Sequence, residues 1–540
     1  MQPAIRNLLL LFVGSLLFHL AGTWTLPLID RDEPRFAEAT REMIERGDYV
    51  VPFFNNQYRF DKPPLTYWFQ AASYRVCGDN DFAARLPSAM AAALTAVVIF
   101  LWGKRIGPER VGLWAAIMFT ICLQTFLHAK AAVADMWLVL FVTAAHWAGY
   151  ELLRDRWGSG ERSTSNVQHP TFNEDAPGVS RAWWWIFYLA LAFAFLAKGP
   201  VGWTPLLAIT AMKFLLPGVK LNRRFGFVSG VLLVLSIIAV WGIPALMRTN
   251  GDFFYVGIGR HVVGRSLVAL EGHGGKSIGF YMLTLPFYFV VIFATFFPWS
   301  LKLPWLTRRL CQARDPIDSY LITSAAVVFI IFTIVKTKLP HYTLPAFPLL
   351  ALLLAKNLRD VPNASRLVKR SAIAGGCVAL LGALATPFLA TLVPSLQLMK
   401  QARHELTPEM EFGAISYKDP SLVWYFRKHV RGWMTDLDQD RSVTSRPPSW
   451  PEIARPGAVV TAPSPKPAAT AASVAKHFAG VKRRTEEFMN KPGGRFVIVP
   501  TKMVATLYPT LPADWITFSA SGLTTATGRP LDLTLILKRL

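Results

Sequence analysis

Long apolar segments alternate with short polar loops along the first 393 residues. Hydropathy predicts about eleven membrane-spanning helices of roughly 17–25 residues each. They fall at residues 5–27, 87–103, 108–128, 132–153, 182–197, 200–216, 226–247, 278–305, 318–336, 342–356 and 371–393. Because 278–305 is long and several loops are short, we expect about 11–13 spans. The pattern predicts an α-helical polytopic membrane protein.

Basic residues predict the orientation of these helices. The loops after even-numbered spans are rich in Lys and Arg, which marks the cytoplasmic side of a membrane. Examples are Lys104, Arg105, Arg154, Arg223, Arg308 and Lys369. We therefore expect the N-terminus inside and, with an odd number of spans, the C-terminus outside. The first apolar run is not followed by a small-residue cleavage site, so we expect it to be retained as an anchor.

The loop 28–86, after the first span, is large and highly charged. Two of its segments, Glu33–Arg46 before Gly47 and Leu65–Val76, have the pattern of amphipathic helices at a membrane interface. In the first segment, the apolar side holds Phe36, Ala39, Met43 and Ile44, and the polar side holds Glu38, Arg41, Glu42 and Glu45. We expect this loop to be ordered and to lie outside the cytoplasm.

The pattern changes to that of a soluble segment from residue 394. Short apolar runs alternate with helical stretches, which predicts a small α/β or α+β domain over 394–540. Residues 1–393, with the loop 28–86, form the predicted transmembrane domain. No Gly-rich dinucleotide motif, P-loop or zinc-ligand spacing occurs in the C-terminal part, so we expect no nucleotide cofactor.

Composition narrows the class of protein and of partner. Hydrophobic residues make up 52% of the chain and charged residues only 17%, which excludes an ordinary soluble enzyme. The formal net charge of +23 suits an anionic partner. In a membrane protein that partner is expected to be a lipid phosphate, and we expect no nucleic acid. The four cysteines are scattered and form no disulfide framework.

The outer loops hold more basic residues than the topology rule predicts. The loop 28–86 contains eight of them: Arg31, Arg35, Arg41, Arg46, Arg59, Lys62, Arg75 and Arg85. Either these charges belong to a solvated loop that neutralises itself, or an anionic substrate binds on the outer side. Uncompensated charge beside a membrane is costly and usually has a purpose. The second interpretation therefore predicts a catalytic site on this face.

Five short motifs, in this order, resemble the membrane glycosyltransferases of the GT-C architecture. The motifs are Asp32–Arg35 (DEPR), Phe60–Pro64 (FDKPP), Ala84–Ser88 (ARLPS), Ala197–Pro200 (AKGP) and Lys338–Pro345 (KLPHYTLP). Within that class they are most similar to the bacterial transferases that move 4-amino-4-deoxy-L-arabinose onto lipid A, relatives of the protein O-mannosyltransferases. The resemblance covers roughly residues 1–395 and is weaker beyond.

The resemblance implies a fold, a donor and a reaction. It implies many transmembrane helices, a large first periplasmic loop and a C-terminal periplasmic domain. It also implies that an amino sugar moves, with inversion, from undecaprenyl phosphate to the phosphates of lipid A, which lowers negative surface charge and gives polymyxin resistance. A monomer in the bacterial inner membrane, with its active site on the periplasmic face, is expected.

Site residues follow from the same resemblance. Asp32 and Asp135 match its two catalytic acidic positions. The groups expected around the donor phosphate are Lys62, Arg265, Tyr342 and Arg35. Structural alternatives remain for each: a helix N-cap for either aspartate, an interfacial Lys62 reaching toward water, and an interfacial aromatic role for Tyr342.

A divalent metal, with zinc favoured, is implied at Asp61 and His261. The family more often has Glu at the first of these positions, and Asp is one methylene shorter. A lone histidine is more often a hydrogen-bonded structural residue than a ligand, so both interpretations stay open.

Two further functions compete with lipid A modification. The acceptor can instead be a hydroxyl of a protein or glycan, in which case Asp32 would act as a general base. The chain can also be a polyprenol or lipid transporter. Transporters often carry internal repeats and broken helices at mid-membrane, whereas here no repeat is found and the charges gather at one face, which favours an enzyme.

Overall fold

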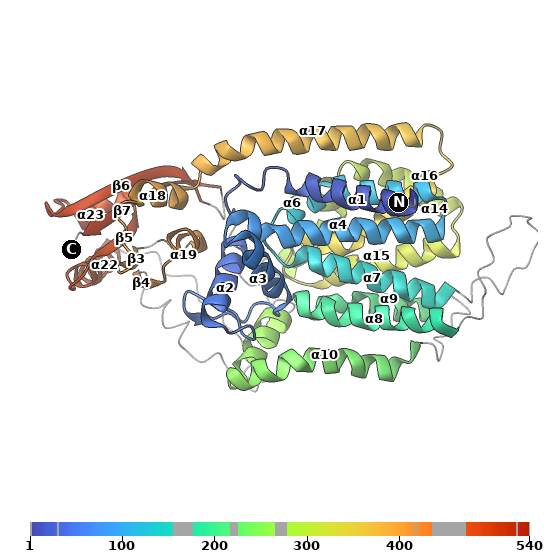
Figure 1. Ribbon diagram of the computed structural model, residues 1–540, viewed down its shortest axis with the longest axis horizontal. Coiled ribbons are helices and arrows are strands. Elements are labelled where there is room, and N and C mark those ends of the chain that lie inside the picture. Colours follow the sequence, from blue (N-terminus) through green and yellow to red (C-terminus); the bar gives the residue numbers. More distant parts are fainter. Residues whose placement is uncertain are drawn as a thin grey trace, which may run out of the picture. The chain divides into compact units, whose positions relative to one another are not determined.

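The computed structural model describes residues 3–29, 32–154, 177–215, 225–264, 278–415, 417, 419–434, 471–524 and 528–538 (Figure 1). The chain divides into two compact units. The helical unit comprises Met1–Ala21, Phe60–Gly78 and Arg85–Gly382, and the mixed unit comprises Gly22–Arg59, Asp79–Ala84 and Ala383–Leu540.

Helices make up the helical unit. In its first half they are α1 (Pro3–Leu20), α3 (Leu65–Cys77), α4 (Asp81–Ile106), α5 (Glu109–Ile121), α6 (Leu123–Ala129), α7 (Asp135–Arg154), α8 (Pro177–Lys198), η1 (Pro200–Trp203), α9 (Thr204–Leu215) and α10 (Phe227–Arg248). In its second half they are η3 (Phe253–Gly264), α12 (Ile278–Thr284), α13 (Phe287–Thr295), η4 (Trp299–Lys302), α14 (Leu303–Gln312), α15 (Pro316–Ile334), η5 (Pro340–Ala346), α16 (Phe347–Leu358) and α17 (Ala364–Thr391). The first residues of α4 and the last residues of α17 belong to the mixed unit. Each predicted span overlaps one of these helices or a run of consecutive ones.

The predicted membrane class is confirmed. Among the described residues, five helices are long and apolar enough to cross a membrane by themselves: α4, α7, α10, α15 and α17. Two bent pairs, α5 with α6 and Tyr281–Thr295 with Trp299–Gln312, raise the number to seven if each pair is one span. The other predicted spans coincide with shorter or partly described helices. Hydropathy therefore predicted the positions of these spans better than their lengths.

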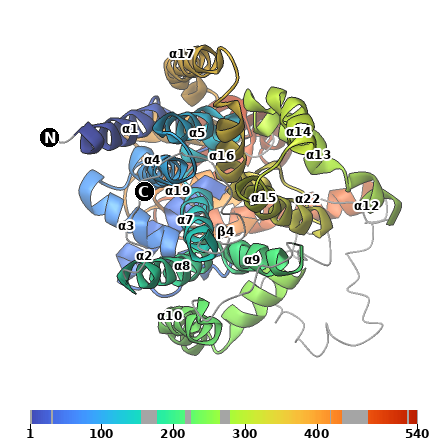
Figure 2. The same cartoon turned by 90° about the vertical axis from the view of Figure 1, so that its right-hand side faces the viewer.

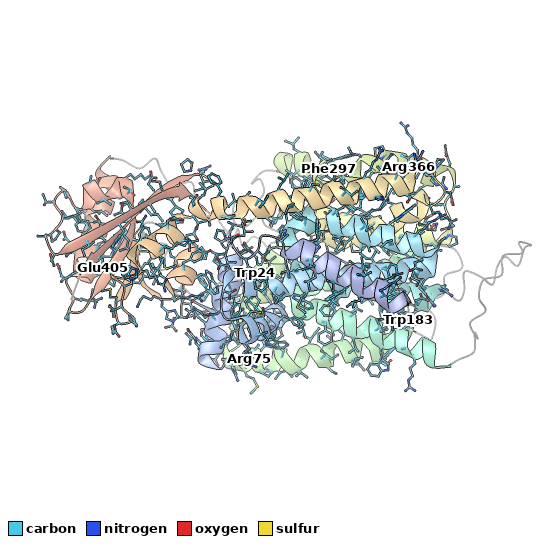
Figure 3. All side chains as sticks on the ribbon, turned by 45° about the horizontal axis from the view of Figure 1, so that its top comes forward. Trp24, Arg75, Trp183, Phe297, Arg366 and Glu405 are labelled. Atoms are coloured by element: carbon cyan, nitrogen blue, oxygen red, sulfur yellow. The ribbon has the colours of Figure 1, made fainter. Side chains whose placement is uncertain are left out.

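The helix ends agree with the predicted sidedness. Figure 3 shows Trp183, near the start of α8, and Arg366, near the start of α17, at the same end of the helical unit. These helices follow the loops after the fourth and tenth predicted spans. Both loops were expected on one side because both are rich in arginine and lysine.

Two lysines of the outer loops stabilise helix ends. The Lys130 ammonium donates hydrogen bonds to the carbonyl oxygens of His19 (2.9 Å) and Ala21 (2.6 Å), at the end of α1. Lys338 donates to the carbonyls of Phe332 (3.0 Å) and Val335 (2.6 Å), at the end of α15. Cations suit these positions because the last carbonyls of a helix lack partners within it. Part of the unexpected basic charge therefore has a structural role.

Helices α4 and α5 pack with their backbones in direct contact. A Cβ atom on Gly112 would lie 2.3 Å from the carbonyl oxygen of Phe100, and one on Gly103 would lie 2.3 Å from the Gly112 Cα. Only glycine allows so close an approach, and small residues are typical of such interfaces between membrane helices.

The mixed unit contains a five-stranded sheet in the order β4-β3-β5-β7-β6. Its strands are β3 (Glu411–Ile415), β4 (Val430–Met434), β5 (Arg495–Pro500), β6 (Trp515–Leu523) and β7 (Pro530–Lys538). The other elements are α2 (Asp32–Arg46), β1 (Phe53–Phe54), β2 (Gln57–Tyr58), α18 (Pro394–Ala402), α19 (Pro420–Phe426), α22 (Ala471–Met489) and α23 (Thr501–Leu507). Strand β3 pairs in parallel with β4 and β5, whereas β7 is antiparallel to β5 and β6. The predicted α/β domain is confirmed.

Strand β5 explains why this sheet has two cores. All six of its residues are buried. Phe496 and Ile498 belong to one apolar cluster, and the alternate residues Val497 and Val499 belong to another. Successive side chains of a strand point to opposite faces, so a continuous apolar run indicates a sheet covered on both sides.

The first loop packs with the C-terminal residues. Helix α2 begins and ends within one residue of the predicted segment and is followed by Gly47, which has a φ of +64°. The pattern separated an apolar from a polar side, but most of the polar side is buried too, with Glu38 and Glu42 at 0% exposure, whereas Glu45 is exposed. Contact between α2 and α19 explains this difference. The predicted domain boundary near residue 393 stays a prediction.

The glycine contact between α4 and α5 can be tested by adding one methyl group. We expect Gly112→Ala to lower the free energy of unfolding by roughly 1–3 kcal/mol, because overpacking forces the helices apart. Gly376→Ala on α17 is the matched control, since nothing lies within 4 Å of its new Cβ. Thermal unfolding of the detergent-purified chain is the measurement. Equal melting temperatures for the two variants would contradict the contact.

Candidate functional site

A buried ion pair joins the ends of two neighbouring helices of the helical unit. Asp135 is the first residue of α7 and Lys198 the last of α8, and these helices lie side by side (Figures 1 and 2). The Lys198 ammonium donates a hydrogen bond of 2.5 Å to Asp135 Oδ1. Only 14% of the Lys198 side chain and 10% of the Asp135 side chain are exposed. A pair with so little access to water is held tightly and is weakly screened by salt.

The sequence ends α8 directly after this lysine. Gly199 has a φ of +79°, a conformation that glycine adopts at little cost, and Pro200 starts the next short helix η1. The turn therefore fixes Lys198 as the last residue of α8. This is the local reason why the motif Ala197–Pro200 holds a lysine at the site.

Two histidines complete this group. The His341 Nε2 atom lies 4.0 Å from Asp135 Oδ1, and the ring centroids of His341 and His128 are 4.8 Å apart. Gln124, one turn earlier on α6, forms a 2.9 Å hydrogen bond with His128 Nδ1. Burial lowers the pKa of His341 to about 3, against the opposing effect of the Asp135 charge. At neutral pH this imidazole is therefore neutral.

Tyr342 and Lys62 belong to the same neighbourhood. The Tyr342 ring meets the His341 ring edge to face at 5.1 Å, and Lys198 Nζ lies 5.8 Å from the Tyr342 centroid. The positive charge of Lys62 also contributes to the lowered pKa of His341, so Lys62 is within electrostatic range. Three predicted site residues, Asp135, Lys62 and Tyr342, thus come together from distant parts of the sequence.

Asp32 and Arg35 lie in the other compact unit. Asp32 is the first residue of α2 and 59% of its side chain is exposed, with Arg35 Nη1 3.8 Å from Asp32 Oδ1. The chain is held at Leu28, because the Leu28 N–H donates to the Tyr425 hydroxyl at 2.8 Å, and this hydroxyl donates to Asp81 at 3.1 Å. Asp32 is therefore presented at the head of an anchored helix.

The remaining predicted residues are only partly described. Arg265 lies outside the described residues, and so does the side chain of His261, whose backbone belongs to η3. Asp61 is half-buried, and its carbonyl oxygen accepts a hydrogen bond of 3.2 Å from Lys62 Nζ. The metal pair of Asp61 and His261 stays a prediction.

Three residues of the site were not predicted. Lys198 and His341 lie in motifs that carry the resemblance, and a lysine directly before Gly-Pro at the end of an apolar span was a usable signal. His128 gave no local signal, because only the fold brings α6 close to η5.

The arrangement can hold a charged ligand. It offers an ammonium and a tyrosine beside a carboxylate, with imidazoles that can accept or donate a hydrogen bond. Cations placed at phosphate oxygens stabilise a departing phosphate, and a carboxylate stabilises growing positive charge at carbon. These side chains therefore suit a reaction in which a group is transferred from a phosphate.

Comparison with known proteins points to the same chemistry. The family model of dolichyl-phosphate-mannose-protein mannosyltransferases matches residues 61–159. An undecaprenyl phosphate-α-4-amino-4-deoxy-L-arabinose arabinosyl transferase of Sodalis glossinidius is 31% identical over 358 residues, which cover 63% of this chain and 58% of that protein. The enzyme of the same name from Aeromonas hydrophila is 28% identical over 353 residues, or 64% and 59% of the two chains.

Solved structures share the fold over nearly the whole chain. The crystal structure of ArnT from Cupriavidus metallidurans bound to undecaprenyl phosphate superposes with a TM-score of 0.70 at 18% identity, covering 97% of each chain. The chain thus has the polytopic GT-C fold with a small C-terminal β-containing domain, and the predicted resemblance is confirmed.

The buried ion pair has a measurable effect on stability. We expect Asp135→Asn and Lys198→Met each to cost roughly 3–5 kcal/mol, because each leaves the other charge buried without its partner. The double variant should lose much less than the sum of the two. Thermal unfolding is the measurement, with exposed Lys336→Met as the control. Additive losses would show that the two charges do not interact.

Proposed function

We propose a function from the premise that a chain with this fold and these relatives is a polyprenyl-phosphate-dependent glycosyltransferase. In this proposal the protein moves 4-amino-4-deoxy-L-arabinose from undecaprenyl phosphate to phosphate groups of lipid A. The single observation that carries the proposal is the buried Asp135–Lys198 pair, with Tyr342 and His341 beside it. Transfer lowers the negative charge of lipid A, which is the physical basis of polymyxin resistance.

The chemistry assigns a role to each charge. The bond between the anomeric carbon and the donor phosphate oxygen breaks, and a lipid A phosphate oxygen attacks the opposite face, which inverts the configuration. Lys198, Lys62 and Arg265 stabilise the negative charge that grows on undecaprenyl phosphate, and Tyr342 donates a hydrogen bond to it. Asp135 orients the Lys198 ammonium. The acceptor phosphate is already anionic and needs positioning more than activation.

Asp32 and Arg35 supply the second set of charges in this proposal. The exposed Asp32 carboxylate stabilises positive charge at the anomeric carbon or orients the acceptor. Arg35 Nη1 lies 3.8 Å from it and supplies a further cation for the donor phosphate. The predicted zinc at Asp61 and His261 would add a Lewis acid near Lys62. Because only Asp61 has a described side chain, we assign no step to a metal.

The location of the enzyme follows from its substrates. Undecaprenyl phosphate and lipid A are lipids, so we place the protein in the bacterial inner membrane as a monomer, with its active site at the periplasmic face. The arginine-rich loops of the opposite side would then face the cytoplasm.

A hydroxyl acceptor is the alternative function. The match of residues 61–159 to protein mannosyltransferases favours it. In that reaction the acceptor proton must be removed, and Asp32 would act as the general base. The donor half of the site would be unchanged.

Mass spectrometry of lipid A distinguishes these functions. Cells with the gene should gain lipid A species heavier by one aminopentose per modified phosphate, and cells without the gene, or with Asp135→Asn, should lack them. An unchanged lipid A profile, together with new glycosylated protein, would support the hydroxyl acceptor instead. No new product of either kind would contradict both transferase functions.

Asp32→Asn separates charge from shape. The amide keeps the size of the side chain and its place at the start of α2 but removes the negative charge. We expect transfer to fall by about 10²–10⁴-fold with normal expression and nearly unchanged donor binding. Single-turnover transfer by the purified variant is the measurement. Near-normal transfer would return Asp32 to a purely structural role.

A further inference from the structure

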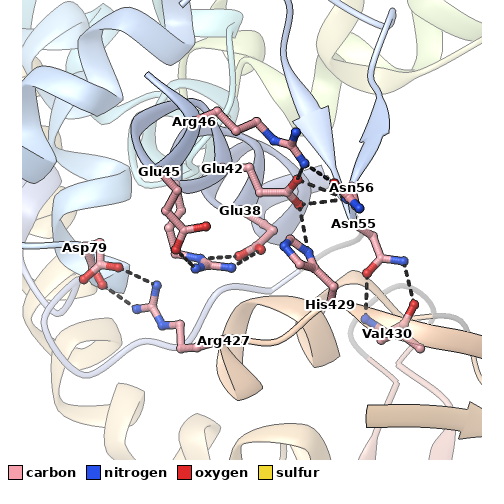
Figure 4. Close-up of polar contacts among 11 residues, drawn as sticks. Glu38, Glu42, Glu45, Arg46, Asn55, Asn56, Asp79, Arg427, His429 and Val430 are labelled. Atoms are coloured by element: carbon pink, nitrogen blue, oxygen red, sulfur yellow. Dashed lines mark hydrogen bonds and ion pairs between the residues drawn. The ribbon is translucent and has the colours of Figure 1, made fainter. Parts of the chain in front are cut away.

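Three side chains with metal-binding atoms meet where α2 contacts the segment between α19 and β4 (Figure 4). Glu38 and Glu42 lie one helical turn apart on α2, and His429 directly precedes β4. One donor atom of each residue lies within 4.8 Å of those of the other two. Both glutamates are fully buried, while 39% of the His429 side chain is exposed, which leaves a route from solvent. All three residues belong to the mixed unit.

The histidine nitrogen faces a carboxylate at a distance that suits a shared ion. His429 Nδ1 is buried and has no hydrogen-bond partner among the described residues. It lies 3.7 Å from Glu42 Oε1, which is too long for a hydrogen bond. Two ligands bound to one Zn²⁺ at about 2.0–2.2 Å lie about 3.3–3.6 Å from each other. The observed 3.7 Å is close to the upper end of this range, so a small shift would place an ion between the two atoms. A buried nitrogen without a partner is costly otherwise.

Neighbouring arginines do not use up the carboxylates. Arg41 donates to both oxygens of Glu38, through Nε at 2.9 Å and Nη2 at 2.5 Å, and also to Glu45. Arg46 lies 3.6 Å from Glu42, which also accepts a backbone hydrogen bond. An ionised carboxylate has about four acceptor sites, so each glutamate keeps capacity for a metal.

The charge balance of the group favours a cation at this place. The three glutamates of the group, Glu38, Glu42 and Glu45, outnumber its two arginines by one. Arg427 does not correct this imbalance, because it pairs with Asp79 at 2.8 Å.

We propose that Glu38, Glu42 and His429 bind one divalent cation of the zinc type, which fastens α2 to the C-terminal part of the mixed unit. One imidazole nitrogen and two carboxylates are ligands that Zn²⁺ accepts, with water at the fourth position. The side-chain amide of Asn55 already fastens the same region, since it exchanges hydrogen bonds of 3.1 and 2.7 Å with Val430. The cation adds a second fastening and does not depend on the proposed function.

Zinc binding to the full-length chain tests this site. The detergent-purified protein is stripped with a chelator, titrated with Zn²⁺ and analysed for bound metal by mass spectrometry. We expect His429→Gln and Glu42→Gln each to bind one equivalent less than wild type, with the affinity of this site at least tenfold weaker. His404→Gln, which removes an exposed histidine of the same unit, is the control and should bind as wild type does. Any other zinc site is present in wild type and in all three variants, so it does not affect the difference in bound zinc between them.

Hydrogen exchange provides a second readout. The Val430 amide donates to Asn55, so zinc should slow its exchange about tenfold in wild type and have no effect in His429→Gln. Because His429 is partly exposed, that variant should fold even if Glu42→Gln does not. Equal zinc content in wild type and His429→Gln, or exchange at Val430 that zinc does not change, would overturn the proposal.

Discussion

The buried contact between Asp135 and Lys198 is the interaction on which the candidate site depends. Each charge is costly to bury alone, and the fold keeps both because α7 begins and α8 ends at the same place. The short helix η5 positions His341 and Tyr342 beside this ion pair. An ammonium held in this way needs little rearrangement to meet an anionic ligand, which is the usual source of electrostatic catalysis.

A second set of contacts builds the mixed unit around the first loop. Asp81 accepts hydrogen bonds from Trp424 (2.6 Å) and Tyr425 (3.1 Å), and Tyr425 in turn accepts one from the backbone N–H of Leu28. Together with the group of Glu38, Glu42 and His429, these contacts hold the chain at Leu28 and the helix that begins at Asp32. A large first loop can therefore present one carboxylate accurately, because it is part of a folded unit.

The sequence predicted what depends on local pattern. Apolar runs located the membrane helices, and the 3.6-residue period with Gly47 gave α2 almost to the residue. Partners far apart in sequence were not predictable in this way. Nothing near Glu38 indicates that a contact between α2 and α19 buries its charge. Likewise, Lys130 and Lys338 have the pattern of substrate-binding cations, and only the fold reveals that they bind helix ends. Lys198 stood inside a recognised motif, but its partner is 63 residues away.

Measuring the binding of undecaprenyl phosphate tests most directly whether the site around Asp135 and Lys198 binds the lipid-linked donor. Native mass spectrometry of the detergent-purified chain can give the dissociation constant for wild type, Lys198→Met and the exposed control Lys336→Met. Loss of one charge-assisted contact to phosphate predicts binding at least about tenfold weaker in Lys198→Met. Lys336→Met should bind as wild type does. Equal affinity in all three proteins would show that the lipid phosphate binds elsewhere.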